Sequence, residues 1–509
     1  MSHANTGLPA GPDVSAAVSE THTGVVFFVG DRAYKLKKPV SLGFLDFGTR
    51  EARERACHRE LELNRRFSPD VYLDVADVHD SSGRPRDHLV VMRRMPSGRR
   101  LSTLVASQVA VDDALRAVAR QLAAWHARAP RNAEISAEGT RDALLSRWAA
   151  SFDQVRPFHD RPLSSTGARE IERLVRAFLA GREPLFDARI ADGRVIDGHG
   201  DLMADDIFVL DDGPRVLDCL EFDDKLRYLD GLDDASFLAM DLERLAAPTL
   251  ARRFIRWYSE YAADPAPLSL RHHYVAYRAF VRAKVACLRH GQGDPAASAE
   301  AAALADVALR HLRAGEVTLV LVGGLPGVGK STLAGALAEQ LGWALISSDR
   351  LRKESAGIPP EHAAAAPFGT GLYDQPSTSR TYATLLDHAR RLLARGESVV
   401  LDASWTDRLH REAAEALATD LHATLVQLRC EAPADVAAQR LRTRPRGYSD
   451  ADHAVAAAMA GRADAWPEAS TIDTDRPVEE SLDSAVALVR PHGHEHVWHS
   501  PVDPVYALP

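Results

Sequence analysis

Cysteine is scarce in this 509-residue sequence, and its four copies lie far apart. Cys57, Cys219, Cys287 and Cys430 form no C-x-x-C pair, which argues against a disulfide framework or a zinc site and favours reduced thiols. No apolar run is long enough to cross a bilayer, and residues 1–18 lack the basic start and apolar core of a secretory signal. We therefore expect a cytoplasmic protein with a mobile first segment.

An excess of basic charge is also missing. The 62 Lys and Arg residues are outnumbered by 71 Asp and Glu residues, which gives a formal net charge of -9. An extended nucleic-acid or anionic-membrane surface is therefore not expected, although a small basic pocket is compatible with this balance. The apolar content of 46% is ordinary for a globular protein, and the length suits two or three domains.

Glycine, in contrast, is concentrated after the apolar run Val317–Val322, which predicts a strand. Gly324–Ser331 then match the pattern G-x-x-x-x-G-K-[ST] without a gap. Glycines allow a tight curl whose N–H groups point at phosphate oxygens, and the helix expected next adds its positive end. Lys330 is expected to reach the β- and γ-phosphates of ATP, and Ser331 to ligate Mg²⁺. The predicted nucleotide-binding residues are Gly324, Leu325, Pro326, Gly327, Val328, Gly329, Lys330, Ser331 and Thr332.

Two more strands are predicted downstream, and each leads to an Asp. The strand that begins at Trp343 is expected to end in Asp349, which Arg352 follows three residues later, and the strand that begins at Glu397 is expected to end in Asp402. Ligands of open α/β sheets bind at the carboxyl ends of strands, so Asp402 fits a Mg²⁺ ligand, directly or through water. The first spacing resembles polynucleotide kinases and related small P-loop kinases, which implies that Asp349 activates an acceptor hydroxyl and Arg352 orients the substrate. The alternatives are a helix N-cap for Asp349 and a strand-end turn for Asp402.

A basic stretch, Arg440–Arg446, follows another predicted strand at residues 423–429. It resembles the lid of nucleoside-monophosphate-kinase-like enzymes, which implies that Arg440 and Arg444 neutralise charge on the transferring phosphoryl group. A solvated basic run is the alternative. Residues 356–378 lie where such kinases carry acceptor-binding insertions.

The first half of the chain opens with a strand pattern over residues 24–39 that predicts a β-hairpin. Lys35 and Lys37 share one face of its second strand because strand side chains alternate. The helix predicted over residues 51–66 contains Glu60. A strand lysine followed by a helix glutamate is how kinase-type folds fix a phosphate-binding lysine, whereas solvated surface lysines are the alternative.

The segment Asp197-Gly-His-Gly-Asp-Leu-Met-Ala-Asp-Asp resembles the catalytic loop H-G-D-x-x-x-x-N of the aminoglycoside phosphotransferase family, a branch of the protein-kinase-like fold. The resemblance implies that Asp201 accepts the proton of a substrate hydroxyl and that Asp218 binds Mg²⁺. Asp206 stands where the family usually has a second metal-binding Asn, and Met203 replaces a common His. Asp206 still offers oxygen ligands, but its extra charge is expected to raise a carboxylate pKa.

The resemblance extends over nearly the whole chain. The stretches Tyr34-Lys-Leu-Lys-Lys-Pro, Arg59-Glu-Leu-Glu-Leu-Asn, Phe237-Leu-Ala-Met-Asp-Leu-Glu and Tyr277-Arg-Ala-Phe-Val-Arg are similar to a bacterial two-part family. Its members fuse an aminoglycoside phosphotransferase-like domain to a C-terminal P-loop kinase. The resemblance implies that Lys35 is the phosphate-binding lysine and Glu60 its partner, and Lys37 stays open for the first role.

We therefore predict an α+β kinase-like domain with two lobes, followed by an α/β doubly wound parallel-sheet P-loop kinase domain. Residues 102–185 and 233–312 are mostly helical by periodicity. The predicted parts are a mobile N-terminus (1–18), a kinase-like N-lobe (19–98), a helical C-lobe (99–298), a helical connector (299–315), the P-loop kinase domain (316–490) and a C-terminal tail (491–509).

The predicted function is an ATP- and Mg²⁺-dependent phosphotransferase with two nucleotide-binding domains, which transfers the γ-phosphate to the hydroxyl of a small molecule. Two alternatives stay open. Because of Asp206 and Met203, the first half could be an inactive nucleotide sensor that regulates the second half. The P-loop half could instead phosphorylate a nucleic-acid 5′ end, although the acidic charge balance weighs against a long duplex footprint.

Overall fold

The computed structural model describes residues 17–20, 24–40, 46–359, 374–443 and 453–490. It divides the chain into two compact units: Met1–Gly139 with Gly193–Asp264, and Thr140–Asp192 with Pro265–Pro509. The predicted fold class is confirmed, since the first unit contains an antiparallel sheet with helices and the second contains a parallel P-loop sheet. The boundaries drawn from the sequence stay a prediction.

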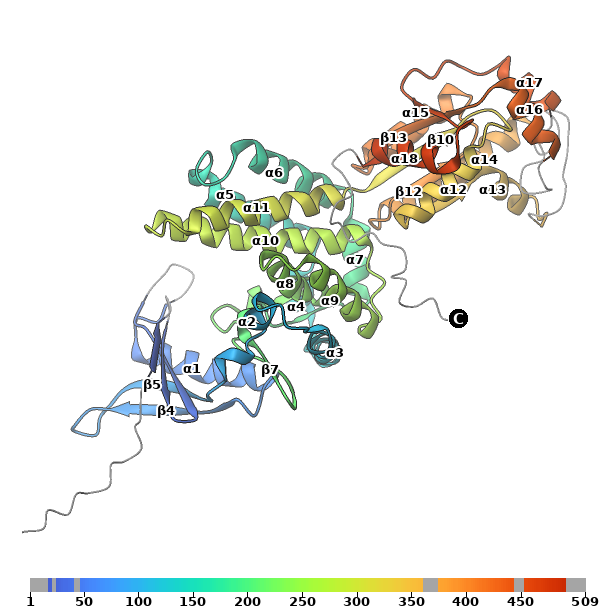
Figure 1. The fold of residues 1–509 in the computed structure, drawn as a ribbon. Helices are drawn as coiled ribbons and strands as arrows, with labels where there is room; N and C mark the ends of the chain where they lie inside the picture. The colour runs from blue at the N-terminus through green and yellow to red at the C-terminus, as the bar shows by residue number, and fades with distance from the viewer. Residues whose placement is uncertain (1–16, 21–23, 41–45, 360–373, 444–452, 491–509) are drawn as a thin grey trace, which may run out of the picture. The chain divides into compact units, whose positions relative to one another are not determined.

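An antiparallel sheet, which includes β4 and β5 in Figure 1, opens the first unit. It has five strands in the order β1-β2-β3-β5-β4. Its strands are β1 (Ala17–Glu20), β2 (Gly24–Val29), β3 (Arg32–Lys37), β4 (Tyr72–His79) and β5 (Pro85–Arg93). β2 and β3 form the predicted hairpin. β1 was not predicted: Ala17 and Val18, expected in a mobile segment, pair with Phe28 and Phe27 of β2, which gives their backbone groups hydrogen-bond partners.

Helix α1 (Arg50–Arg65) packs against this sheet. Thr49 caps its N-terminus, because the Thr49 side-chain oxygen accepts a hydrogen bond from the backbone N–H of Ala52. Cys57 and Leu61 of α1 lie in a buried cluster with residues of β3 and β5. Because of this packing, one face of α1 lies against the sheet. Glu60 is fully buried.

Helices and two short β-ribbons complete the first unit. Antiparallel pairing joins β6 to β9 and β7 to β8, and the second ribbon has its turn at Asp211-Asp212. The remaining elements are α2 (Leu101–Ala106), α3 (Asp112–Arg128), α4 (Ala133–Glu138), β6 (Val195–Asp197), the short 3-10 helix η3 (Ala204–Asp206), β7 (Ile207–Leu210), β8 (Gly213–Val216), β9 (Tyr228–Asp230), α8 (Gly231–Arg244) and α9 (Pro248–Tyr261).

Five helices precede the second sheet within the second unit. They are α5 (Arg141–Val155), α6 (Ser165–Ala180), α7 (Glu183–Ala191), α10 (Leu268–Gly291) and α11 (Ala297–Ala314). α11, expected to be a connector, packs along α10 and also contacts α6. Trp148 of α5 is fully buried beside Phe280 of α10, so it serves as core packing.

The second sheet has the order β11-β12-β10-β13-β14, and all its pairings are parallel. Its strands are β10 (Thr318–Gly323), β11 (Ala344–Ser347), β12 (Val399–Asp402), β13 (Thr424–Glu431) and β14 (Ser470–Asp473). The first strand in sequence therefore lies at the centre of the sheet. Because the strands are parallel, their carboxyl ends meet at one edge, where ligands of this architecture bind.

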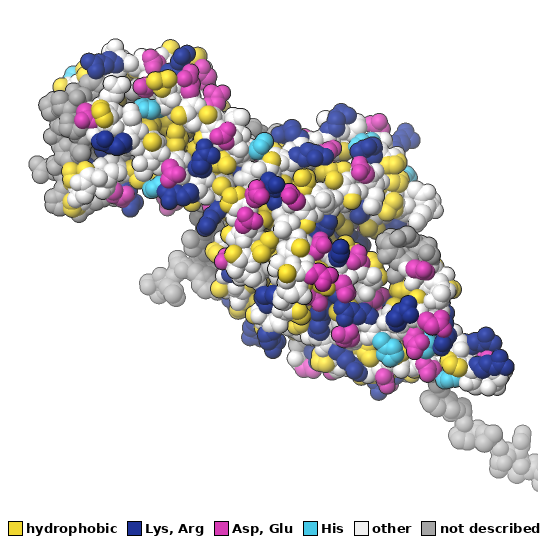
Figure 2. Space-filling view, turned by 180° about the vertical axis from the view of Figure 1, so that it is seen from behind, with side chains coloured by type: hydrophobic (Ala, Val, Ile, Leu, Met, Phe, Trp, Pro, Cys, Tyr) yellow, Lys and Arg dark blue, Asp and Glu magenta, His cyan; other side chains and the backbone are white. Residues whose placement is uncertain are grey.

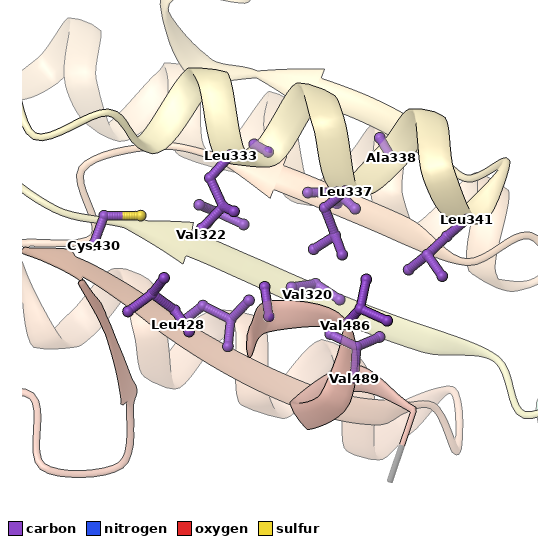
Figure 3. Close-up of a cluster of buried hydrophobic side chains, with 14 of the residues drawn as sticks. Val320, Val322, Leu333, Leu337, Ala338, Leu341, Leu428, Cys430, Val486 and Val489 are labelled. Atoms are coloured by element: carbon purple, nitrogen blue, oxygen red, sulfur yellow. The ribbon is translucent and has the colours of Figure 1, made fainter. Parts of the chain in front are cut away.

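Helices cover both faces of this sheet, as the two-faced burial of β10 requires. Figure 3 shows Val320 and Val322 of β10 pointing toward Leu333 and Leu337 of one helix, while another helix contributes Val486 to the same buried cluster. The helices are α12 (Lys330–Leu341), α13 (Ser348–Ser355), α14 (Gln375–Leu393), α15 (Arg408–Asp420), α16 (Ala434–Thr443), α17 (His453–Ala460) and α18 (Val478–Val489). Figure 3 thus places α12 and α18 on one face, and α14 and α15 contact the sheet outside that cluster.

The surface mixes both signs of charge. Figure 2 shows Lys and Arg side chains interspersed with Asp and Glu over the described part of one face, in keeping with the acidic balance of the sequence. All four cysteines are free and buried. Among the described residues, no helix combines the length and apolar character needed to cross a membrane.

Candidate functional site

The loop between β10 and α12 is curled by three glycines. Gly324, Gly327 and Gly329 have φ values of 139°, 89° and 96°, a region that side chains disfavour. A Cβ at Gly324 would lie 2.7 Å from the carbonyl oxygen of Cys430, and a Cβ at Gly327 would lie 2.6 Å from that of Ala437. Both backbone conformation and close neighbours therefore require glycine at these positions.

The residues after the curl are open to a ligand. Lys330 begins α12 and is half-buried, and Ser331 next to it is exposed. The first N–H groups of α12 lack partners within the helix, so this end attracts anions. The Thr474 hydroxyl lies within hydrogen-bond distance of the carbonyl oxygens of Val328 and Glu431, so it ties the loop to the end of β13. Thr474 follows β14 and had no sequence motif to reveal it.

Asp402, at the end of β12, brings a carboxylate to the same place. Its side chain is buried, and Oδ1 has no hydrogen-bond partner among the described residues. Burial raises the pKa of Asp402, nearby Asp349 raises it further, and the Lys330 ammonium and Ser331 hydroxyl lower it. These interactions show that Asp402, Asp349, Lys330 and Ser331 gather at the carboxyl edge of the sheet.

This arrangement fits a magnesium ion. A buried carboxylate oxygen without a partner, beside an exposed hydroxyl, offers the hard oxygen ligands that Mg²⁺ prefers. Among the described residues, no three His, Cys, Asp or Glu side chains form a ready metal cage. Mg²⁺ in phosphoryl-transfer sites needs only one or two carboxylates, since phosphate oxygens and water complete its coordination.

Asp349 lies in the first turn of α13 and not at the end of β11, which ends two residues earlier. The cap position of α13 is Ser347, so Asp349 is not its N-cap. The Asp349 carboxylate accepts a hydrogen bond from Nη1 of Arg352 at 2.6 Å. The buried Tyr382 lies near both, since their charges perturb its pKa, which burial raises.

The loop after β12 is held in a strained conformation. Trp405 is fully buried with φ of 52°, a left-handed value that is uncommon for a residue with a side chain. Its backbone N–H donates to the Tyr382 hydroxyl at 3.1 Å, and its carbonyl oxygen accepts from Nη1 of Arg411 at 2.8 Å. A strained backbone that several contacts maintain is typical of ligand-binding sites. The sequence analysis did not identify Trp405 or Tyr382 as residues of the site.

A cavity of about 300 Å³ lies between this loop and the P-loop. Trp405 and Trp466 contribute aromatic surface, and Trp466 Nε1 donates to Oε1 of Gln427 at 2.7 Å. The volume suits a small molecule. The lining residues are Gly324, Leu325, Val328, Ser404, Trp405, Thr406, Arg429, Cys430, Glu431, Ala432, Ala463, Asp464 and Trp466.

Arg440 of α16 lies beside the P-loop. Its Nη2 donates to the carbonyl oxygen of Thr474 at 2.9 Å, and Nη1 lies 3.6 Å from the point where a Cβ of Gly329 would be. The guanidinium is therefore next to the curl that would hold phosphates. Arg444 lies outside the described residues, as do residues 360–373 of the predicted acceptor insertion and the tail 491–509.

In the first unit, Lys35 and Lys37 both contact Glu60. Lys35 Nζ lies 2.9 Å from Glu60 Oε1 and 2.6 Å from Asp218 Oδ1. Lys37 Nζ lies 2.7 Å from Glu60 Oε2 and 2.5 Å from Oε1 of Glu221. Lys35 therefore reaches the expected metal-binding Asp218, whereas Lys37 is buried among structural partners. Glu221 was missed, although it follows Asp218 closely in the sequence.

Opposite charges dominate the electrostatics of this cluster. Burial alone would lower the pKa of Lys35, but Asp218, Glu60 and Glu221 outweigh it and hold the pKa well above its ordinary value. Burial opposes ionisation of Glu60, yet Lys35 and Lys37 hold its pKa well below the usual range. Lys35 and Glu60 are therefore both charged at neutral pH.

The catalytic-loop segment is anchored by Asp234 of α8. Asp234 Oδ2 accepts from the backbone N–H of His199 at 2.7 Å, and Oδ1 accepts from that of Gly200 at 2.9 Å. His126 Nε2 lies 3.1 Å from the same carboxylate. The loop before Asp201 is thus fixed by a buried charge that sequence reasoning missed, because Asp234 lies within an ordinary helical pattern.

Asp206 has its pKa raised well above the ordinary value, first by burial and then by the charges of Asp218 and Asp201. The expected repulsion is therefore present, but burial is the larger cause. The interactions also show that the three carboxylates lie near one another. Met203 is buried.

Replacement of Asp206 by Asn gives a pH-dependent prediction. Between the ordinary and the raised pKa, the folded protein binds more protons at Asp206 than the unfolded chain does, so its stability falls as pH rises through that window. Asp206→Asn removes this loss. The hydrogen-exchange protection of the first unit should therefore be higher in Asp206→Asn than in wild type, and this difference should grow as pH rises from the ordinary carboxyl pKa toward the raised one. Asp205→Asn, at an exposed neighbour, is the control, and an advantage that stays constant with pH would contradict the prediction.

Comparisons with known proteins find a family model for part of the chain and relatives of nearly all of it. A family model described as an AAA domain matches residues 319–465. Protein Rv2004c of Mycobacterium tuberculosis and Mb2027c of Mycobacterium bovis, both described as uncharacterized, are each 44% identical over 485 residues, which cover 95% of this chain and 96% of theirs.

Solved structures with low TM-scores are also similar to parts of the chain. The GDP and kanamycin complex of APH(2")-IIia is 18% identical and covers 58% of this chain and 94% of its own, with a TM-score of 0.39. A gluconokinase from Sinorhizobium meliloti is 22% identical and covers 35% and 93%, with a TM-score of 0.26. The identity to the mycobacterial proteins spans both the kinase-like half and the P-loop half. The chain therefore belongs to the same two-part family as these mycobacterial proteins.

Proposed function

We propose that the chain is an ATP-dependent phosphotransferase whose P-loop half transfers the γ-phosphoryl group to a hydroxyl of a small molecule. The observation that carries the proposal is the gathering of Lys330, Ser331, Asp349 and Asp402 at the carboxyl edge of the sheet. A phosphate-binding curl, a buried carboxylate with an unpartnered oxygen and a second carboxylate near it are the parts that phosphoryl transfer needs.

Each residue has a role that follows from its position. The P-loop amides and Lys330 bind the phosphate chain, and Asp402 with Ser331 would hold Mg²⁺, which offsets phosphate charge when bound. Asp349 accepts the proton of the acceptor hydroxyl, whose oxygen forms a bond to the γ-phosphorus as the bond to the bridging oxygen of ADP breaks. Arg352 orients the Asp349 carboxylate, and Arg440 stabilises charge on the transferring group. The products are a phosphate ester, ADP and a proton.

The cavity lined by Trp405 and Trp466 is the proposed acceptor site. It adjoins Gly324 and Leu325 of the P-loop, and its walls combine aromatic surface with polar groups such as Asp464 and Thr406. Such walls suit a molecule with an apolar face and several hydroxyl groups.

The test is transfer of label from ATP labelled at the γ-phosphate, with the full-length chain and a panel of sugars, amino alcohols, aminoglycosides and a 5′-hydroxyl oligonucleotide. Asp349→Asn should lower kcat about 10²-fold because the general base is lost, while KM for ATP changes little. Asp387→Asn, on the exposed side of α14, is the matched control. An Asp349→Asn protein as active as wild type would remove Asp349 from the mechanism, and transfer to the oligonucleotide alone would favour a nucleic-acid 5′-end kinase.

A second candidate function, nucleotide sensing by the first unit, is favoured by two observations. Asp218 is ion-paired with Lys35, and the pKa of Asp206 is raised. Both carboxylates are therefore less available to bind Mg²⁺ than free, ionised carboxylates would be. Asp201→Asn separates the two possibilities. Unchanged phosphoryl transfer by Asp201→Asn, together with loss in Asp349→Asn, would favour a sensor, whereas loss of one of two acceptor activities would favour two catalytic sites.

A further inference from the structure

A second cavity of the second unit lies far from the P-loop. Its volume is about 210 Å³, room for about seven water molecules. It adjoins Val317 and Thr424, at the amino ends of β10 and β13. The P-loop follows the carboxyl end of the six-residue β10, so about 20 Å of strand separates the two sites. The lining residues are Arg173, Leu174, Ala177, Phe178, Arg182, Ser269, His273, Leu312, Gly315, Glu316, Val317, His422, Ala423 and Thr424.

Arg182 gives this cavity a buried positive charge. Its side chain is among the largest fully buried ones, with 1% of the residue exposed. Nη1 donates to the carbonyl oxygens of Gly181 at 2.9 Å and Leu421 at 2.7 Å, but Nε has no partner, and no described carboxylate pairs with the guanidinium. Burial lowers the pKa of Arg182 to about 10, so the group is still charged at neutral pH. A buried cation without an anion is costly unless a ligand supplies one.

His273 adds a second unsatisfied donor to the same cavity. Its Nε2 accepts a hydrogen bond from Nε1 of Trp148 at 3.2 Å, so a neutral ring carries its proton on Nδ1. Nδ1 is buried and has no partner among the described residues. Burial lowers the pKa of His273 to about 3, which keeps the ring neutral. Phe178 stacks on it at 4.4 Å between ring centroids and fixes its orientation.

The rest of the lining defines what fits. Arg173 is exposed and makes no ion pair with a described residue, so it adds a cation at the rim. Glu316 is the one carboxylate of the lining, and its charge also acts on Arg490, a buried group outside the cavity. Leu174 and Leu312 supply apolar wall. An oxyanion facing the two unsatisfied donors, attached to a short organic part, would match this lining.

We propose that this cavity binds a small organic anion, such as a phosphate monoester or carboxylate below nucleotide size, through the guanidinium of Arg182 and the Nδ1–H of His273. The ligand would contact α6, α10 and the amino end of the P-loop sheet together, so its binding would stabilise the second unit. The site is independent of the proposed phosphotransfer chemistry at the other edge of the sheet.

The test uses full-length Lys330→Ala protein, so that anions do not bind at the P-loop. Inorganic phosphate, glycerol 3-phosphate and succinate are added at constant ionic strength, and the unfolding temperature Tm and the Kd by calorimetry are measured. At about 100 times Kd, the best of these anions should raise Tm by about 5 °C. The three arms distinguish a bare oxyanion, a phosphate ester and a carboxylate.

Two further substitutions in the Lys330→Ala background locate the site. Arg182→Met should weaken binding by about 30-fold or more, because a charged hydrogen-bond donor is removed. Arg173→Glu, at an exposed position that tolerates change, should weaken it about 10-fold by charge reversal. Arg176→Gln, on the same helix but paired with Glu172, should have no effect. No Tm shift with any of the anions, or a shift that survives Arg173→Glu and Arg182→Met, would overturn the proposal.

Discussion

Replacement of Lys330 by alanine is expected to lower kcat of phosphoryl transfer by the P-loop half about 10³-fold. Lys330 begins α12 next to the curl of Gly324–Gly329, and its charge acts on Asp402. It is therefore well placed to neutralise the β- and γ-phosphates as charge develops during transfer. Loss of one such preorganised donor costs about 10²–10³-fold in other enzymes, and loss of a full charge puts this change at the upper end.

The measurement is release of ADP and of phosphorylated acceptor by the full-length protein under saturating ATP. Arg391→Ala is a matched control, because it removes an exposed cation of α14 that pairs only with Asp387 on the surface. If Lys330→Ala turned over ATP at the wild-type rate, all of the activity would come from the kinase-like half.

Replacement of Glu60 by glutamine is expected to destabilise the first unit by about 3–5 kcal/mol. The fully buried Glu60 carboxylate bridges the ammonium groups of Lys35 and Lys37 at 2.9 Å and 2.7 Å. Glutamine keeps the shape but removes the charge, so the buried Lys37 and the partly buried Lys35 keep only Asp218 and Glu221 to offset their charges. Removal of one partner from a buried ion pair typically costs this much.

Hydrogen exchange at the amides of β3 and α1 is the measurement, since a chain with two units need not unfold in one two-state step. Glu62→Gln is the control: Glu62 lies on the same helix, is largely exposed and pairs with Arg59. The Glu60 contribution has a defined pH sign. Its pKa is lowered on folding, so wild type loses this stabilisation as pH falls through the lowered pKa, and the variant lacks that loss. Equal protection in both variants would show that the lysines are satisfied without Glu60.

Much of the second unit follows from local sequence. The run Val317–Val322 and the glycine spacing after it predict strand, curl and helix, because phosphate binding by backbone amides imposes that order. The strands before Asp349 and Asp402 are short apolar runs, and the structure has them as β11 and β12. The two-residue error at Asp349, which lies inside α13, reflects how poorly sequence locates the end of an element.

The residues that complete the sites were not predictable in the same way. Thr474, Tyr382 and Trp405 belong to no motif, and they act through partners 22 to 146 residues away in the sequence. β1 was missed because four exposed residues have no alternating pattern, and only their pairing with β2 makes them a strand. The sequence does not distinguish Asp234 from the other acidic residues of α8. Its role is visible only in the structure, where it accepts hydrogen bonds from the backbone N–H groups of His199 and Gly200.

The two folds, their order and the phosphate-binding curl could be predicted from the sequence, because they depend on residues that are neighbours along the chain. The sharing of charges depends instead on the tertiary structure. Lys35, and not Lys37, reaches Asp218, although both lie on one strand face and both contact Glu60. The tertiary structure also buries Arg182 where no carboxylate of the described residues pairs with it. Burial and pairing set the energy of a charge, and both depend on residues that folding brings together from distant parts of the chain.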